Sequence, residues 1–291
     1  MAQPSHQPIV HLVGSVPLPD PETVFHTLSG ALGTYLKRMP DGETGRRARW
    51  IRFVHQHLEA HPDMEVDPDV PLYQFKQWDG KIVREWRQLK FKDGVDLSAV
   101  VFNTGYADDA IRSFALFQRL QEAGVIPSGV KYQACMATPL AISYMFIAPR
   151  ARQDFTRVYT AHLRAEVERI AEALPHDQLA YQWDVCQEVL MWENYFPQPP
   201  NYQEEIFSVL GRIGDAVPAT IDLGYHLCYG SPLDEHCVQP KDMANMVEIA
   251  HGIVNAVTRP LQYLHMPVPR DRNDDAYFQP LQNLVLTETS A

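Results

Sequence analysis

The sequence predicts an α/β fold of the TIM type, with parallel strands and helices alternating around a barrel that lacks or rebuilds its last two strands. Short apolar runs that end in Gly, Pro or polar residues alternate with longer stretches in which apolar residues recur every three or four positions. The chain has 291 residues, which suits one barrel of about 250 residues with an insertion. A hydrophobic content of 45% supports one large core and excludes global disorder. We therefore expect a single domain over residues 1–291.

Six apolar runs are predicted as strands, each bounded by turn-forming residues: Ile9–Gly14, Val100–Gly105, Val130–Met136, Leu179–Val185, Thr220–Cys228 and Leu261–Met266. The amphipathic stretches that follow the second to fifth runs predict crossover helices: Asp108–Ala123, Arg150–Leu174, Tyr202–Asp215 and Lys241–Val257. A closed barrel has eight strands, so two are missing or rebuilt. Because an open sheet has two unpaired edges, we expect a second copy of the chain to cover them in a homo-oligomer, in the simplest case a dimer.

Residues 16–97 form a long insertion between the first two predicted strands. One helix is expected at about Pro21–Lys37 and another at about Gly45–Ala60. The segment after them mixes charged residues with aromatic ones and predicts an irregular lid or a small hairpin; its aromatic residues are Tyr73, Phe75, Trp78 and Trp86.

Charge and composition exclude several classes of partner. The chain carries 25 Lys and Arg against 36 Asp and Glu, which gives a net charge of −11. Nucleic acids and anionic membranes attract basic surfaces, so we expect neither as a partner. No Gly-rich dinucleotide or P-loop pattern occurs, so we expect no nucleotide cofactor. No apolar run reaches the 18 or so residues of a membrane span.

The cysteines indicate a reducing compartment. Cys135, Cys186, Cys228 and Cys237 form no CxxC pair, and a chain of this length does not need a disulfide framework. The first residues show no basic segment followed by an apolar run, as a signal peptide would have. We therefore expect reduced thiols and a cytoplasmic protein.

Polar residues gather where the predicted strands end. In a βα barrel the chemistry lies at the carboxyl ends of the strands, on one rim. The residues expected on that rim are Gly14 and Ser15, Asn103 to Gly105, Cys135, Asp184, Cys186, His226, Cys228 and His265. This rim is the predicted site.

His226 and Cys228 are the sharpest local signal on the rim. Two positions apart on a strand, they point to the same face, so an imidazole and a thiolate could share one zinc ion. Such spacing also occurs by chance, with a half-buried His and an inert Cys as the alternative. His265, at the end of the next strand, offers a third ligand within reach.

Four segments resemble one known family. VGSVP at 13–17, YQWDV at 181–185, HLCYG at 226–230 and LHMPVPR at 264–270 are similar, in this order, to the cobalamin-independent methionine synthase superfamily, in its single-barrel branch. The resemblance implies zinc ligands at His226 and Cys228, with His265 where the synthases have a glutamate. It also implies that the backbone at Gly14 and Ser15 holds the substrate and that Asp184 receives an ammonium group.

The resemblance has one clear departure. After His265 the relatives continue through two more strands, and the second of these bears the last zinc cysteine, whereas this chain reaches Ala291 first. Either Cys135 or Cys186 takes the place of that ligand, or the metal is lost and the pocket is used for different chemistry.

Two basic segments are further candidates. In PDGETGRRARW, Gly42 and Gly45 followed by Arg46 could hold a carboxylate or phosphate, or the segment could be a capped helix start with a solvated Arg face. Arg270, just beyond His265, could bind a substrate anion, or it could belong to a solvated loop.

Other residues are given structural roles. Trp183 and Trp192 are expected in the core or the pocket wall. Glu188 and Glu193 are expected in solvent.

Three functions are compatible with this sequence. The first is an enzyme that transfers a methyl or alkyl group to a thiol with zinc bound by His226, Cys228 and His265. The second is a metal-free lyase, isomerase or cyclase of specialised metabolism in which Asp184, His226 and His265 act as acids, bases or polarising groups. The third is a non-catalytic binding protein. In the first two the partner is a small-molecule substrate.

Overall fold

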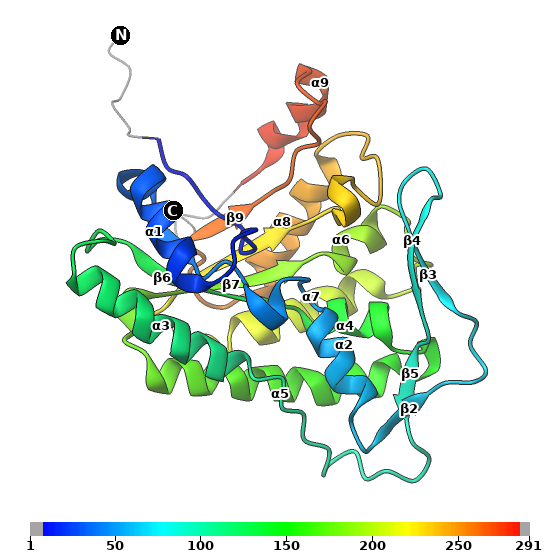
Figure 1. Ribbon diagram of the computed structural model, residues 1–291. Helices are drawn as coiled ribbons and strands as arrows, with labels where there is room; N and C mark the ends of the chain where they lie inside the picture. The colour runs from blue at the N-terminus through cyan, green and yellow to red at the C-terminus, as the bar shows by residue number, and fades with distance from the viewer. Residues whose placement is uncertain (1–7, 286–291) are drawn as a thin grey trace.

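The computed structural model describes residues 8–285 and shows an α/β fold around one curled parallel sheet (Figure 1). Its five strands lie in the order β1 (Arg38–Pro40), β6 (Lys131–Ala137), β7 (Leu179–Val185), β8 (Asp222–Leu227) and β9 (Tyr263–His265), and every pairing is parallel. The α/β class and the barrel-like curl are confirmed. The sheet is a half-barrel and not a closed barrel of eight strands.

The helices pack around this sheet, with α3 and α5 running along one side of it (Figure 1). No helix within residues 8–285 is long and apolar enough to cross a membrane. The α-helices are α1 (Pro21–Leu32), α2 (Arg52–Glu59), α3 (Tyr106–Glu122), α4 (Pro139–Phe146), α5 (Arg152–Ala173), α6 (Gln187–Trp192), α7 (Tyr202–Gly214), α8 (Ala244–Ala256) and α9 (Asp275–Phe278). The short 3-10 helices are η1 (Gly33–Tyr35), η2 (Gly45–Arg47), η3 (Pro149–Ala151), η4 (His176–Gln178), η5 (Pro232–Asp234) and η6 (Gln279–Asn283).

Two small antiparallel pairs lie beside the main sheet (Figure 1). β3 (Tyr73–Lys76) pairs with β4 (Ile82–Trp86), which confirms the predicted hairpin, and β2 (Met64–Val66) pairs with β5 (Leu89–Phe91). The indole Nε1 of Trp86 donates a hydrogen bond to the Met145 carbonyl at the end of α4, at 2.7 Å. The hairpin is therefore fastened to the helix that follows β6.

The prediction of a strand at Ile9–Gly14 was wrong. Val10 of this segment makes an isolated bridge with Leu36, and Ser15, just after the segment, makes one with Gly42. Its carbonyl groups at residues 12 and 13 accept hydrogen bonds from glutamine side chains and not from a neighbouring strand. The segment therefore lies against the inner face of the sheet.

The prediction of a strand at Val100–Gly105 was also wrong. Side chains from elsewhere bond the backbone of this loop: His61 Nε2 lies 3.0 Å from the Val101 carbonyl, and the Asn103 N–H donates to His57 Nε2 at 3.2 Å. Because these groups are already satisfied, the loop does not need a strand partner. The edge of β6 is paired instead by β1, a strand within the predicted insertion and too short to show a period.

The two edge strands contact each other across the interior of the half-barrel. Arg38 from β1 lies 4.2 Å above the Tyr263 ring of β9, and its guanidinium reaches the Asp222 carboxylate of β8 at 3.1 Å. Lys131 of β6 donates to the same carboxylate at 2.8 Å. The inner face of the sheet therefore carries polar side chains, and contacts within one chain join its two edge strands. The homo-oligomer stays a prediction.

Candidate functional site

Three predicted site residues lie in one row across the half-barrel. In the strand register Asp184 of β7 is opposite His226 of β8, and His226 is opposite His265 of β9. The two imidazoles are hydrogen-bonded through their Nδ1 atoms, 2.7 Å apart. Since parallel strands present their carboxyl ends on one rim, the predicted convergence of these three residues is observed.

The two imidazoles differ in protonation. Burial works to lower the pKa of His226, but its hydrogen bond to Cys228 and the nearby charges of Cys228, Asp184 and Glu43 outweigh burial, so the pKa is raised. Burial lowers the pKa of His265 to about 3, and the charge of His226 lowers it further. Only one hydrogen can lie between two Nδ1 atoms, and these opposite pKa shifts favour His226 as the donor and His265 as the acceptor.

Cys228 follows His226 on the same strand face. The Cys186 thiol donates a hydrogen bond to Cys228. Together with the hydrogen bonds from His226 and the Gly230 N–H, this bond lowers the pKa of Cys228 well below its usual value, although burial works in the opposite direction. The Gly230 nitrogen lies 3.2 Å from the Cys228 sulfur. The pKa of Cys186 is raised in return, first by its hydrogen bond to Cys228 and then by burial. Cys228 is the thiolate of this pair.

Asp184 is the buried acid of the row. Burial, and then the charge of Glu43, raises its pKa to about 8. Gln182, two residues earlier on β7, donates to Asp184 Oδ1 at 2.8 Å, and Trp50 also bonds the carboxyl. At neutral pH Asp184 therefore carries a proton that it can give away.

Glu43 was not identified from the sequence. Its carboxyl is buried, which raises its pKa, and it accepts a short hydrogen bond from the Ser15 hydroxyl. Gly14 approaches it so closely that a Cβ there would lie 3.4 Å from Glu43 Oε2. Glu43 and Trp50 both have positive φ, at 50° and 51°. Glu43 and Trp50, which both interact with Asp184, are therefore held on strained backbone, as is common at functional sites.

Arg46 is bonded to the loop that precedes α3 and to α3 itself. Arg46 donates to the Thr104 carbonyl at 2.8 Å, to the Gly105 carbonyl at 3.0 Å and to the Asp109 carboxylate at 2.5 Å. Its guanidinium thus fixes a loop onto α3. Arg270 is exposed on the loop after β9.

The prediction that Glu188 is in solvent was wrong. This side chain is 1% exposed, accepts a hydrogen bond from Thr138 Oγ1 at 2.5 Å, and has its pKa raised to about 7 by burial. Glu193 is half-buried and receives a hydrogen bond from Asn245 at 3.0 Å. Trp183 and Trp192 are buried, as expected of core residues.

The predicted zinc ligands lie together but do not fit zinc in this arrangement. Two nitrogen ligands at about 2.0–2.1 Å from a tetrahedral ion lie about 3.3 Å apart. The Nδ1 atoms of His226 and His265 are only 2.7 Å apart and face each other. Across residues 8–285 no group of three or more His, Cys, Asp or Glu side chains is placed to hold a metal ion.

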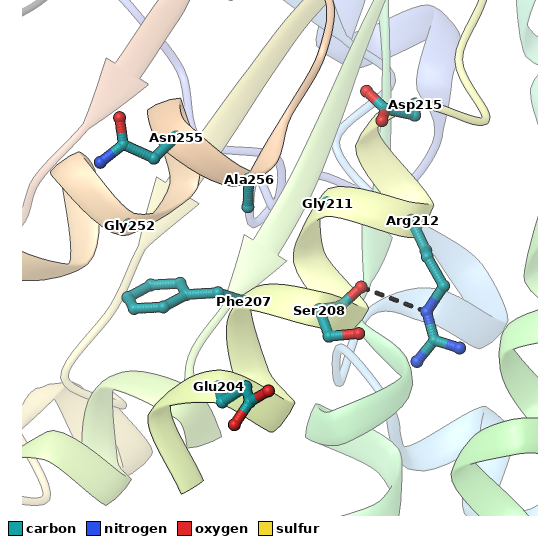
Figure 2. A pocket seen from close by; sticks show the side chains of 9 residues that line it. All are labelled: Glu204, Phe207, Ser208, Gly211, Arg212, Asp215, Gly252, Asn255 and Ala256. Carbon is teal, nitrogen blue, oxygen red and sulfur yellow. Dashed lines mark hydrogen bonds between the residues drawn. The ribbon is translucent and has the colours of Figure 1, made fainter. Parts of the chain in front are cut away.

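Two cavities lie outside this site, each of about 620 Å³. One is an open groove between α7 and α8, where Phe207, Gly211, Gly252 and Ala256 form the wall (Figure 2). The other lies between residues 97–103 and α5. Neither is lined by the row of Asp184, His226 and His265.

Comparisons with known proteins give a fold but no family. No family model matches the chain, and no curated protein matches it. Among solved structures it is similar to a protein from Listeria monocytogenes that carries a provisional assignment as a vitamin-B12-independent methionine synthase, at 11% identity and a TM-score of 0.50, over 90% of this chain and 74% of that one. At this identity the similarity shows a methionine-synthase-like fold alone.

Proposed function

We propose that the chain is a metal-free enzyme that moves protons on a small-molecule substrate, as a lyase, isomerase or cyclase does. The observation that supports this proposal is the row formed by Asp184, His226 and His265. The pKa values of Asp184 and His226 are raised, whereas the pKa of His265 is lowered. Displaced pairs of this kind assign the acid and the base of a proton-transfer site.

The protonation states give each residue a role. Asp184, with a pKa of about 8, is the general acid at neutral pH. His226 donates a hydrogen bond to Nδ1 of neutral His265, so His265 carries its own hydrogen on Nε2 and can polarise a group of the substrate. Asp184 gives its proton to one position of the substrate, and the carboxylate that remains takes a proton from another position, so the charge of the site is the same before and after.

Substrate contacts come from the segment that faces these groups. Gly14 and Ser15 lie against Glu43. Burial raises the pKa of Glu43, as it raises the pKa of Asp184. We propose the backbone of Gly14 and the hydroxyl of Ser15 as substrate ligands, with Arg270 as a further ligand for an anionic group. Arg46 is not part of this proposal, because its guanidinium is already used by the loop before α3.

A deuterium-exchange assay tests the proposal. Small carbonyl and hydroxy acids are incubated with the protein in D₂O, and carbon-bound deuterium is measured by mass spectrometry. We expect incorporation into one class of compound, lowered roughly 10²–10⁴-fold by Asp184→Asn and by His265→Gln. Asp154→Asn, on the exposed side of α5, is the control. Tight binding of a compound without any exchange would favour a binding protein.

Zinc-assisted methyl or alkyl transfer is the second candidate, and the shared fold is the observation that favours it. Its ligands would be His226, Cys228 and His265. Their present spacing does not fit the ion, so zinc binding would require the two imidazoles to move apart. Stoichiometric zinc that survives dialysis and is lost in Cys228→Ser would favour this candidate.

A further inference from the structure

We propose that His57 is a pH switch, which holds the loop of residues 101–103 closed while its imidazole is neutral and releases the loop when the imidazole is protonated. Side chains from outside the loop bond its backbone, in place of a neighbouring strand. The loop forms one wall of the cavity of about 620 Å³ beside α5. The inference goes beyond the proposed function, because His57 and this cavity lie outside the row of Asp184, His226 and His265.

The contact between His57 and the loop requires a neutral imidazole. The Asn103 N–H donates a hydrogen bond to His57 Nε2 at 3.2 Å. A backbone N–H can only donate, so Nε2 presents its lone pair, and the one hydrogen of the neutral ring lies on Nδ1. A proton on Nε2 would remove the acceptor and bring two hydrogens against each other. Protonation of His57 and this hydrogen bond therefore exclude each other.

His61 holds the same loop in a way that survives protonation. The Asp63 N–H donates to His61 Nδ1 at 3.2 Å, so the hydrogen of the neutral ring lies on Nε2. This Nε2 lies 3.0 Å from the Val101 carbonyl and donates to it. A second proton, on Nδ1, would leave the donor to Val101 in place.

His162 of α5 is also a donor to the end of the loop. Its Nε2 lies 2.9 Å from Thr104 Oγ1, and the Thr104 hydroxyl gives its own hydrogen to Glu166 Oε1 at 3.3 Å. The hydrogen between His162 and Thr104 therefore belongs to the imidazole. Of these three imidazoles, only His57 accepts from the loop, so only His57 makes the closed loop sensitive to pH.

The groups around His57 keep it neutral while the loop is closed. Burial lowers its pKa, and the charges of His61 and Arg46 lower it further. His162 interacts with His57 from α5, and its own pKa is lowered to about 4, first by burial and then by the charge of His57. The charged side chains next to His162 on α5 pair with each other at 3.6 Å and are Glu166 and Arg169.

The direction of the switch follows from proton binding. In the open loop His57 is in water, with a pKa of about 6.5, so below this pH the open loop binds more protons than the closed one. Closure is therefore favoured at neutral pH and weakens in acid. Between pH 7 and pH 5 one imidazole can raise the ratio of open to closed loop by up to about 20-fold. Phe102, 3% exposed, still favours the closed loop, so protonation changes a population and does not unfold the chain.

Amide hydrogen exchange tests the switch. The exchange rate of the Asn103 N–H is measured by solvent-exchange NMR from pH 7 to pH 5 and divided by the rate of an unstructured chain at the same pH. We expect this ratio to rise by up to about 20-fold as the pH falls. The amides of β7 measure global unfolding, so a rise at Asn103 that exceeds theirs is local.

Two variants assign the effect to one imidazole. In His57→Gln the amide oxygen can accept the same N–H but does not titrate, so the ratio at Asn103 should no longer depend on pH. His61→Gln is the matched control, because it replaces the neighbouring imidazole and leaves His57 in place, so the dependence should remain. A ratio that is equal at pH 7 and pH 5 in the unaltered protein overturns the inference, and so does a dependence that persists in His57→Gln.

A second measurement covers the case in which His57→Gln does not fold. Long-range ¹H–¹⁵N spectra of the unaltered protein at pH 7 should show hydrogen on Nδ1 of His57 and none on Nε2. Hydrogen on Nε2 at pH 7 would overturn the inference, because the ring could not then accept from Asn103.

Discussion

His226 and His265 share a hydrogen bond between their Nδ1 atoms, at 2.7 Å, and the raised pKa of His226 beside the lowered pKa of His265 favours His226 as its donor. The bond joins two neighbouring strands at the rim of the half-barrel, one register position from the buried Asp184. A pair of identical side chains thereby becomes an unequal pair, because only His226 lies beside a thiolate and two carboxyls.

The neutral state of His265 predicts a loss of stability in acid. Its pKa in the folded protein is about 3, against 6.5 for an ordinary histidine, so between these pH values the unfolded chain binds more protons. The stability that His265 contributes is present above pH 6.5 and is lost as the pH falls toward 3. In His265→Gln, the free energy of unfolding in urea should therefore fall less between pH 7 and pH 5.

His162 is the comparison for this experiment, because burial lowers its pKa to about 4 at a place away from the row. His162→Gln should reduce the acid sensitivity in the same direction. An unchanged pH dependence in His265→Gln, with a reduced one in His162→Gln, would contradict the assignment at His265.

The raised pKa of Asp184 implies the opposite dependence of stability on pH. Its pKa in the folded protein is about 8, against 3.8 for an ordinary aspartate, so its contribution to stability is present below pH 3.8 and is lost as the pH rises toward 8. Asp184→Asn should therefore be more stable than the unaltered protein at pH 9, by more than about 1.4 kcal/mol, the equivalent of one pKa unit. Thermal unfolding at pH 5 and pH 9 measures the difference. A variant that is less stable at pH 9 would count against a neutral Asp184.

The position of these residues could be predicted from the sequence, but their environment could not. Leu179–Val185 forms β7 with the predicted bounds, because a buried apolar run between turn residues is a local signal. Parallel strands then bring their ends to one rim, which placed Asp184, His226 and His265 together. The unequal pKa values depend on the neighbours of each ring, and these come from distant parts of the chain.

Glu43 illustrates why the rest could not be predicted. The segment around it has the pattern of a helix start, in which the glycines and Arg46 are the local signals for ligand binding and an acidic residue is expected in solvent. Its burial results from contact with Gly14 and Ser15, about thirty residues earlier. Ile9–Gly14 has the apolar pattern of a strand for the same reason: its carbonyls are bonded by Gln133 and Gln182, which are far away in the sequence.

Helix packing at the groove between α7 and α8 gives a prediction on stability. A Cβ at Gly211 would lie 2.5 Å from the Ala256 carbonyl oxygen, which is backbone and cannot move aside easily. Gly211→Ala should therefore destabilise the protein by about 1–3 kcal/mol in urea unfolding. Gly30→Ala, inside α1 with open space around the site, should stabilise it by up to about 1 kcal/mol. Equal effects of the two variants would contradict the packing of α7 on α8.

The thiolate at Cys228 predicts selective alkylation. At pH 6.5 iodoacetamide should modify Cys228 before the other cysteines, whose pKa values are raised by burial or by hydrogen bonding. Peptide mass spectrometry identifies the labelled residue. Cys228→Ser should lose this fast reaction and Cys237→Ser should keep it. A fast reaction that persists in Cys228→Ser would place the reactive thiolate elsewhere.

The unequal protonation of the histidine pair is tested most directly by long-range ¹H–¹⁵N correlation spectra of the imidazole rings as a function of pH. The arrangement predicts that His226 stays protonated above pH 6.5, that His265 stays neutral down to about pH 4, and that a hydrogen is present on Nδ1 of His226. Two rings that titrate together near pH 6.5, or two Nδ1 atoms that carry metal in place of hydrogen at every pH, would contradict it.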